Sequence, residues 1–167
     1  MVKVTFQGNP VTLVGKQVQV GDTAPDFTVL SNSLEEKTLA DYEGSVKLIS
    51  VVPSIDTEIC SLQTKRFNEE ASALGDNIKI LTISMDLPFA LGRWGGAEDV
   101  EAVDTLSDHR DADFGKKFGL LIEELRLLAR SVFVLDENNE VTYVEIVDEI
   151  ASHPDYDKVL QHIEENH

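Results

Sequence analysis

Two apolar runs rich in β-branched residues, 46–52 and 78–84, limit most strongly how this chain can fold, because they flank a stretch with helical periodicity. Short runs of this kind form buried strands. Between them, Phe67 and Leu74 lie seven residues apart on one helical face, and the pattern predicts a helix over residues 59–74. A strand, a helix and a second strand in this order form a βαβ unit with parallel strands. The sequence therefore predicts an α/β protein.

The only cysteine of the chain, Cys60, falls at the start of this predicted helix. Pro53 ends the preceding strand, and Asp56 or Thr57 is the expected helix N-cap. A thiol reacts as its thiolate, and the partial positive charge at a helix N-terminus favours the anion. The Thr57 hydroxyl lies one helical turn before Cys60, within reach of the sulfur or of a substrate oxygen. The alternative is an unreactive cysteine that packs as a small hydrophobe, since free cysteine is among the most buried residue types.

Pro53, Thr57 and Cys60 match the Pro-x-x-x-Thr-x-x-Cys motif, and on these residues the chain resembles the peroxiredoxins. The longer string Pro-Ser-Ile-Asp-Thr-x-x-Cys resembles the thiol peroxidase subfamily, also called atypical two-cysteine peroxiredoxins. Residues 21–27, Gly-x-x-Ala-Pro-Asp-Phe, and the string over residues 127–133 extend the resemblance to nearly the whole chain. The resemblance implies a thioredoxin-like fold, in which helices flank a central mixed β-sheet.

The resemblance also implies an activity, the reduction of hydrogen peroxide and organic hydroperoxides by a thiol peroxidase. Cys60 would attack the peroxide as a thiolate and become a sulfenic acid. Thr57 and Arg130 would hold the peroxide and stabilise charge on its leaving oxygen, and Pro53 would shield the sulfur from water. By pattern alone an arginine at a strand start is usually exposed. The local string favours Arg130 over its neighbour Arg126, for which we expect a structural role. The resemblance implies no cofactor.

One segment departs from the family pattern. Residues 86–97 resemble the part of thiol peroxidases that carries the resolving cysteine, but this chain has Gly95 at that position. An external thiol, such as thioredoxin or a low-molecular-weight thiol, would then have to resolve the sulfenic acid. Both a natural one-cysteine mechanism and an engineered loss of the second cysteine fit this pattern. Gly95 and Gly96 also predict a poor helix interior and a mobile connector here.

The chain carries 31 acidic residues against 14 basic ones, a formal net charge of −17. We expect no nucleic acid partner, because phosphate binding needs a basic surface. An acidic protein also disfavours a thiolate, so a reactive Cys60 needs a positive charge close to its sulfur. Glu58, where the family usually has a small residue, adds a carboxylate two residues before the cysteine. We expect it to point to solvent; pointing toward the sulfur, it would disfavour the thiolate.

The 167 residues are expected to form one domain, residues 1–167, which is large enough to bury a substantial core. Residues 1–7 lack the apolar region of a signal peptide, and no stretch approaches the length of a membrane span. A single cysteine rules out an intramolecular disulfide, so we expect a protein of the reducing cytoplasm. The family resemblance suggests a homodimer.

Shorter patterns predict the remaining elements. An N-terminal β-hairpin over residues 2–6 and 11–14, turning at Gly8, Asn9 and Pro10, resembles the thiol peroxidase subfamily specifically. The other predicted elements are a strand from Phe27, a helical turn at 39–42, a strand at 103–106, a helix at 114–121, an antiparallel hairpin at 131–135 and 141–146, and an amphipathic helix at 154–165.

Two other classes of function remain open. A peroxide sensor or redox-relay protein would use the same Cys60 chemistry and pass the oxidation to a partner. A non-catalytic thioredoxin-fold binding domain would keep Cys60 buried and inert. A disulfide oxidoreductase is disfavoured, because the chain has no Cys-x-x-Cys motif. We predict no metal site, since the histidines lack ligand spacing, and expect His109 to be a solvated loop residue.

Overall fold

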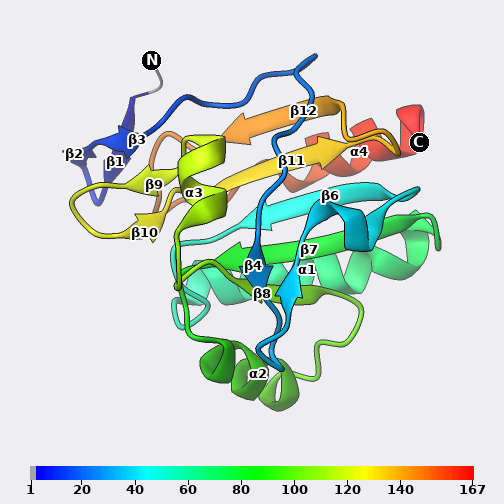
Figure 1. The fold of residues 1–167 in the computed structure, drawn as a ribbon, viewed down its shortest axis with the longest axis horizontal. Coiled ribbons are helices and arrows are strands. Elements are labelled where there is room, and N and C mark those ends of the chain that lie inside the picture. The colour runs from blue at the N-terminus through cyan, green and yellow to red at the C-terminus, as the bar shows by residue number, and fades with distance from the viewer. Residues whose placement is uncertain (1–2) are drawn as a thin grey trace.

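The computed structural model describes residues 3–167 of the chain, in which strands and helices alternate over residues 46–118, from β6 to α3 (Figure 1). The strands are β1 Val4–Phe6, β2 Asn9–Val11, β3 Leu13–Val14, β4 Val29–Leu30, β5 Glu36–Lys37, β6 Val46–Val51, β7 Ile78–Ser84, β8 Asp104–Ser107, β9 Leu121–Ile122, β10 Leu127–Leu128, β11 Ser131–Leu135 and β12 Val141–Ile146. The helices are the 3-10 helix η1 Leu39–Tyr42 and the α-helices α1 Glu58–Leu74, α2 Pro88–Ala97, α3 Asp113–Phe118 and α4 Tyr156–Asn166.

A seven-stranded mixed sheet forms the centre of the molecule, in the strand order β12-β11-β6-β7-β8-β4-β5. β6 and β7 run parallel and are joined through α1, so the predicted βαβ unit is confirmed. β7 and β8 are also parallel, whereas β11 runs antiparallel to both β6 and β12. The predicted helical turn at 39–42 and the hairpin of β11 and β12 are confirmed. No helix within residues 3–167 is long and apolar enough to cross a membrane.

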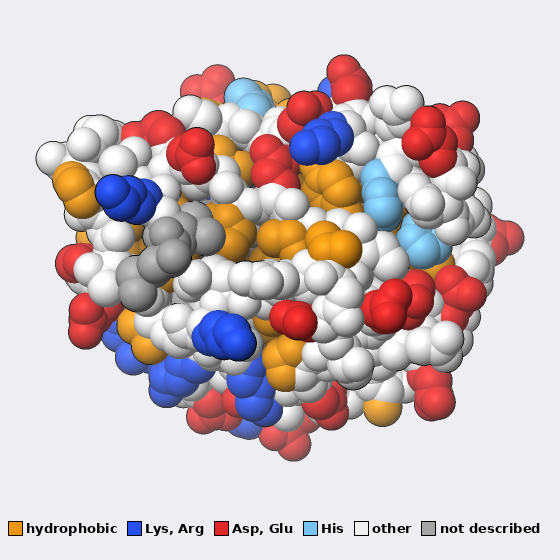
Figure 2. Space-filling model, turned by 90° about the horizontal axis from the view of Figure 1, so that it is seen from above, with side chains coloured by type: hydrophobic (Ala, Val, Ile, Leu, Met, Phe, Trp, Pro, Cys, Tyr) orange, Lys and Arg blue, Asp and Glu red, His pale blue; other side chains and the backbone are white. Residues whose placement is uncertain are grey.

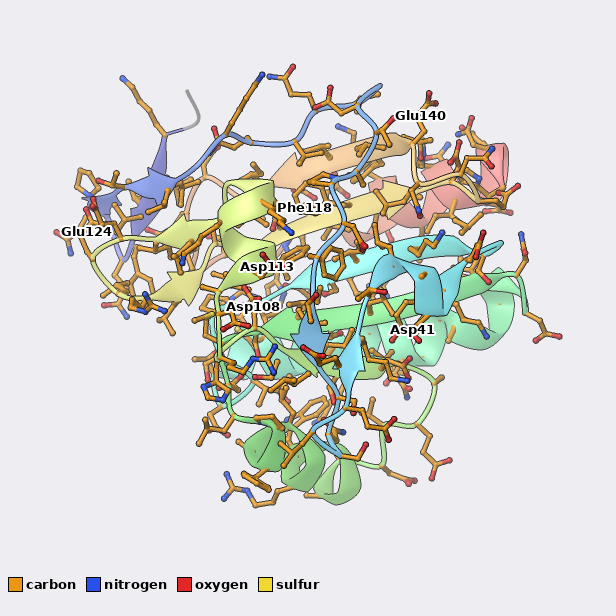
Figure 3. All side chains as sticks on the ribbon, in the orientation of Figure 1. Asp41, Asp108, Asp113, Phe118, Glu124 and Glu140 are labelled. Atoms are coloured by element: carbon orange, nitrogen blue, oxygen red, sulfur yellow. The ribbon has the colours of Figure 1, made fainter. Side chains whose placement is uncertain are left out.

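Two apolar cores fill the two faces of this sheet. On one face, α3 packs through Phe114 and Phe118, with the Phe118 ring 5.3 Å from that of Phe133 in β11 (Figure 3). On the other face, α1, α2 and α4 contribute the buried side chains of Phe67, Leu91, Trp94, Val159 and Ile163. Because apolar neighbours cover β6 on both faces, all six of its residues are buried. Burial of β6 on both faces fixes its carboxyl end, where the loop that leads to Cys60 and α1 begins.

The N-terminal hairpin is present, but its turn lies one residue earlier than predicted. β1 and β2 pair antiparallel with Phe6 opposite Asn9, so Gln7 and Gly8 form the turn. Both have positive φ, 52° and 83°, as a two-residue hairpin turn of this kind requires. Asn9 and Pro10 therefore belong to β2. Val2, the first residue of the predicted hairpin, lies outside the described residues.

The segment predicted as a mobile connector with a poor helix interior is the ten-residue helix α2. Pro88 occupies its first turn, where the missing N–H removes no helical hydrogen bond. Leu91 and Trp94 are buried, and the Trp94 indole donates a hydrogen bond to the Ser61 hydroxyl on α1 at 3.2 Å. Packing of this face outweighs the low helix propensity of Gly95 and its glycine neighbours, so the prediction of a poor helix interior is wrong.

Backbone hydrogen bonds between Thr5 and residues 148–150, and the carboxylate of Glu149, fasten the N-terminal hairpin to the loop after β12. The carboxylate accepts hydrogen bonds from the backbone N–H groups of Gln7 (3.1 Å), Gly8 (2.7 Å) and Ala151 (2.7 Å), and from the Thr5 hydroxyl (3.0 Å). The backbone hydrogen bonds from Ala151 and Gly8 lower the pKa of Glu149 to about 2.

Replacing Glu149 with Gln should loosen the hairpin, because the amide nitrogen of Gln is a donor and cannot accept the hydrogen bonds that one of the two carboxylate oxygens accepts. We expect hydrogen exchange over residues 4–11 to speed up roughly fivefold, equivalent to ~1 kcal/mol. The lowered pKa means that the anchoring by the carboxylate is fully present above about pH 4.5 and is lost as the pH falls through about 2. Glu140→Gln, at the exposed Glu140, is the matched control and should change nothing. Equal exchange rates in wild type and Glu149→Gln would contradict the assignment.

Candidate active site

Cys60 lies in the first turn of α1, directly after the loop that leaves the carboxyl end of β6. Thr57 is the N-cap residue, which decides between the two predicted caps, although its side chain makes no capping hydrogen bond. Cys60 is fully buried (0 % exposed). The backbone N–H groups of a first helical turn point toward its amino end and carry partial positive charge. Cys60 therefore lies where a thiolate is stabilised.

Arg130, which lies just before β11, contacts the Cys60 sulfur. Its Nη2 donates to Cys60 Sγ at 3.2 Å, its Nη1 to Gln63 Oε1 at 2.8 Å and its Nε to the Ile150 carbonyl at 2.7 Å. The side chain is buried (2 % exposed), so little solvent screens its positive charge. β11 pairs with β6 so that Ser131 faces Val51, which sets the preceding Arg130 beside the end of β6. The structure thus brings together two residues 70 positions apart.

Gln63 is a site residue that the sequence reasoning missed. It lies one helical turn after Cys60 and is fully buried. Its Oε1 accepts from Arg130, and its Nε2 donates to the Ser50 hydroxyl on β6 at 2.7 Å. One signal could have found it: with Cys60 and Phe67 it lies on the buried stripe of α1, where a polar residue needs a partner.

The other two predicted site residues lie in the loop before α1. Pro53 is buried, whereas Thr57 is exposed. The Thr57 hydroxyl donates to the Ser54 carbonyl at 3.0 Å, so within the described chain it is not paired with the sulfur. Since its hydrogen is engaged, the hydroxyl oxygen presents lone pairs to a ligand that can donate.

The remaining candidates lie outside this cluster. Arg126 is exposed, with φ of 51° in the turn between β9 and β10, which agrees with a structural role. His109 is exposed, as expected for a solvated residue. Glu58 is exposed as well, so its carboxylate meets solvent at the helix N-terminus.

Tyr156, at the start of α4, is a second residue near the site that the sequence did not indicate. Its ring packs edge-on against Phe67 and under the Arg66 guanidinium, 5.2 Å from the ring centre. Burial raises the pKa of Tyr156 to about 12, although the positive charges of Arg130 and Arg66 act in the opposite direction. The phenol is therefore neutral at physiological pH.

An apolar groove on the surface lies in another part of the fold. It lies between residues 15–20 and the side chains of Val144 and Ile146 on the edge strand β12. Figure 2 looks onto this end of the molecule, where hydrophobic side chains lie between charged ones. None of the lining residues belongs to the cluster around Cys60, so the groove is not part of the candidate active site.

Comparisons with known proteins agree with this geometry. Residues 19–160 match the family described as Redoxin. Thiol peroxidase from Oceanobacillus iheyensis is 63% identical, over 98% of this chain and 99% of the relative, and thiol peroxidase from Bacillus subtilis is 63% identical over 96% of each. The crystal structure of a peroxiredoxin-like protein from Aquifex aeolicus has a TM-score of 0.92 at 39% identity, covering 99% of this chain and 97% of that one. Thiol peroxidase from Chromobacterium violaceum has the same fold, with a TM-score of 0.88 at 22% identity, covering 98% and 96%.

The fold is thioredoxin-like with Cys60 at the turn from β6 into α1, so the predicted fold class is confirmed, and the similarity to a peroxiredoxin-like structure at 39% identity places the chain in the peroxiredoxin class. The chain belongs to the Redoxin family and, within it, to the thiol peroxidase subfamily of the peroxiredoxins. Its sequence contains one cysteine, so the resolving cysteine of the two-cysteine pattern is absent.

Arg130→Met should slow the reaction of Cys60 with peroxide by roughly 100-fold, because one well-placed electrostatic donor contributes about 3 kcal/mol in a transition state. Arg126→Met, which removes the same charge from the exposed turn, should leave the rate unchanged. Stopped-flow measurement of sulfenic acid formation distinguishes the two variants, with circular dichroism to verify folding. The assignment is wrong if Arg126→Met is slow while folded Arg130→Met retains the wild-type rate.

Proposed function

We propose that this thiol peroxidase reduces hydrogen peroxide and organic hydroperoxides with Cys60 as the attacking nucleophile. The observation that carries the proposal is the hydrogen bond from Arg130 Nη2 to Cys60 Sγ at 3.2 Å, at the amino end of α1. A buried positive charge and a helix N-terminus act on the same sulfur and both favour its thiolate. A cysteine that served only as a hydrophobe would need neither.

In the first step a lone pair of the Cys60 thiolate attacks one peroxide oxygen. A sulfur–oxygen bond forms, the oxygen–oxygen bond breaks, and the leaving oxygen takes a proton and departs as water or an alcohol. The guanidinium of Arg130 stabilises the negative charge as it moves from sulfur to the leaving oxygen. The Thr57 oxygen, whose own hydrogen is donated to Ser54, accepts a hydrogen bond from the peroxide O–H. The buried Pro53 keeps water from the sulfur.

The second step uses a thiol from outside the chain, because Cys60 is the only cysteine. The external thiol attacks the sulfenic sulfur, water leaves, and a second thiol releases Cys60 from the mixed disulfide. We propose thioredoxin or a low-molecular-weight thiol as the reductant, a cytoplasmic location where such thiols are kept reduced, and a homodimer of a single domain of residues 1–167. Since the sulfur is fully buried, the loop or the first turn of α1 must open before a thiol reaches it.

A peroxide sensor or redox relay is the second candidate function. The single cysteine favours it, because the oxidation can leave the chain only through another molecule. Steady consumption of peroxide with a small dithiol as the sole reductant supports the peroxidase. A single turnover, followed by transfer of the oxidation to one partner protein, supports the relay.

Stoichiometric peroxide should add a single oxygen to Cys60, and Cys60→Ser should acquire none. The reason is that the thiolate is the nucleophile and no other thiol exists in the chain. Mass spectrometry of the intact protein, with a dimedone trap for the sulfenic acid, measures both forms. The proposal is wrong if Cys60→Ser consumes peroxide at the wild-type rate.

Gly95→Cys should restore the missing resolving thiol. A Cβ at this position meets only the Val100 carbonyl oxygen, at 3.8 Å, so the side chain fits on α2 without strain. We expect a disulfide with Cys60 after one equivalent of peroxide, formed when α2 or the start of α1 unwinds locally, and less overoxidation to sulfinic acid. Gly96→Cys, at a neighbouring open position, is the matched control and should form this disulfide more slowly. Non-reducing mass spectrometry decides, and a persistent free thiol at position 95 beside oxidised Cys60 contradicts the prediction.

A further inference from the structure

The side chain of Asp86 lies against the loop that leads into the active site. Asp86 follows β7 and precedes α2, and its two carboxylate oxygens face the loop between β6 and α1. Oδ1 accepts from the Ser54 hydroxyl at 2.7 Å, and Oδ2 accepts from the backbone N–H of Ile55 at 2.7 Å. Hydrogen bonds to a carboxylate are about twice as strong as those between neutral groups. One side chain therefore holds two successive residues of this loop.

Asp86 is itself fixed by the ends of two strands. The Ser84 hydroxyl on β7 donates to Asp86 Oδ2 at 2.8 Å and accepts from the Asp86 backbone N–H at 3.3 Å. The Ser107 hydroxyl on β8 donates to the Asp86 carbonyl. Both serines are buried, so they are held by the packed core of the sheet. The carboxylate is thus a rigid support and not a mobile surface group.

Hydrogen bonds within the loop connect the residues that Asp86 holds to the proposed catalytic residues Thr57 and Cys60. The Ser54 carbonyl accepts hydrogen bonds from the Thr57 hydroxyl at 3.0 Å and from the Thr57 N–H at 3.2 Å. The Thr57 carbonyl in turn accepts from the Ser61 N–H at 3.0 Å, within the first turn of α1 that carries Cys60. A continuous series of hydrogen bonds therefore runs from Asp86 through Ser54 to the cap of the helix.

We propose that Asp86 is a positioning residue for the peroxide reaction: it fixes the loop so that the Thr57 oxygen and the Cys60 sulfur face the same peroxide. This inference rests on the proposed function of Cys60. The negative charge of Asp86, taken alone, would slow the reaction with peroxide, because a carboxylate close to a thiolate disfavours the thiolate. The two effects differ in sign, so an experiment separates them. Loss of the Asp86 charge alone would speed the reaction with peroxide, whereas loss of the support slows it.

The test compares two reactions of the same sulfur in Asp86→Asn. Reaction with hydrogen peroxide needs the aligned site, whereas alkylation by iodoacetamide needs only an accessible thiolate. We expect sulfenic acid formation to slow by about tenfold or more, which is the scale of a misplaced reacting group. Alkylation of Cys60 should be unchanged or faster, because a looser loop exposes the sulfur. Asp56→Asn, which removes an exposed carboxylate from the same loop, is the matched control and should leave both rates as in wild type.

Ser54→Ala provides a second, milder variant that keeps the Asp86 charge and removes one of its contacts. Its peroxide reaction should also slow, and adding Asp86→Asn should give less than the product of the two separate effects. The inference is overturned if Asp86→Asn matches or exceeds the wild-type rate with peroxide. It is also overturned if the peroxide and alkylation rates fall together with the melting temperature, since that pattern marks a merely structural role.

The Cys60→Ser variant keeps this test separate from the proposed function. If Cys60→Ser is inert toward peroxide and Asp86→Asn reacts at the wild-type rate, only the role of Asp86 fails. If Cys60→Ser still consumes peroxide, the proposed function fails whatever Asp86 does.

Discussion

The buried guanidinium of Arg130 is the interaction on which the site depends. A charge taken out of water is costly unless strong partners surround it, and removing one partner leaves the charge uncompensated. Arg130 has three partners, on the cysteine, on α1 through Gln63 and on the loop before α4 through Ile150. These partners come from distant parts of the chain, so each segment must be in place for the guanidinium to be satisfied. The same contact that favours the thiolate therefore also links α1 to the carboxyl-terminal third of the fold.

The contact between Arg130 and Cys60 matters because the protein as a whole is strongly acidic. With a net charge of −17, the average field of the protein works against a thiolate, so the stabilisation has to be local. Burial of Arg130 supplies it, because a charge in a region that excludes water is screened less than one on the surface. The exposed carboxylate of Glu58 lies in solvent, where its opposing effect is weakened. In the proposed function, the depth of Arg130 within the structure therefore matters more for the sulfur than the number of charges on the surface.

The sequence predicted those parts of the structure that depend on local pattern. The apolar runs and the helical repeat gave the βαβ unit, and the motif residues placed Cys60 at the turn into α1. The partner residues Gln63 and Asp86 were not predicted as site residues, because each acts through contacts that only the folded chain creates. The helix predicted over 114–121 ends at Phe118, with Leu121 in β9, and the two-residue strands β9 and β10 were missed, as so short a segment carries no periodicity. Helix α2 shows the opposite error, in which packing of Trp94 overrode a local preference.

The open space at Gly95 bears on how such enzymes diverge. A Cβ there would meet a single carbonyl oxygen, at an ordinary van der Waals distance. The fold therefore leaves room for a small side chain to begin at this position, and cysteine and glycine codons differ by one nucleotide. A single nucleotide change at this position is therefore enough to add or remove a second thiol while the backbone of α2 stays as it is.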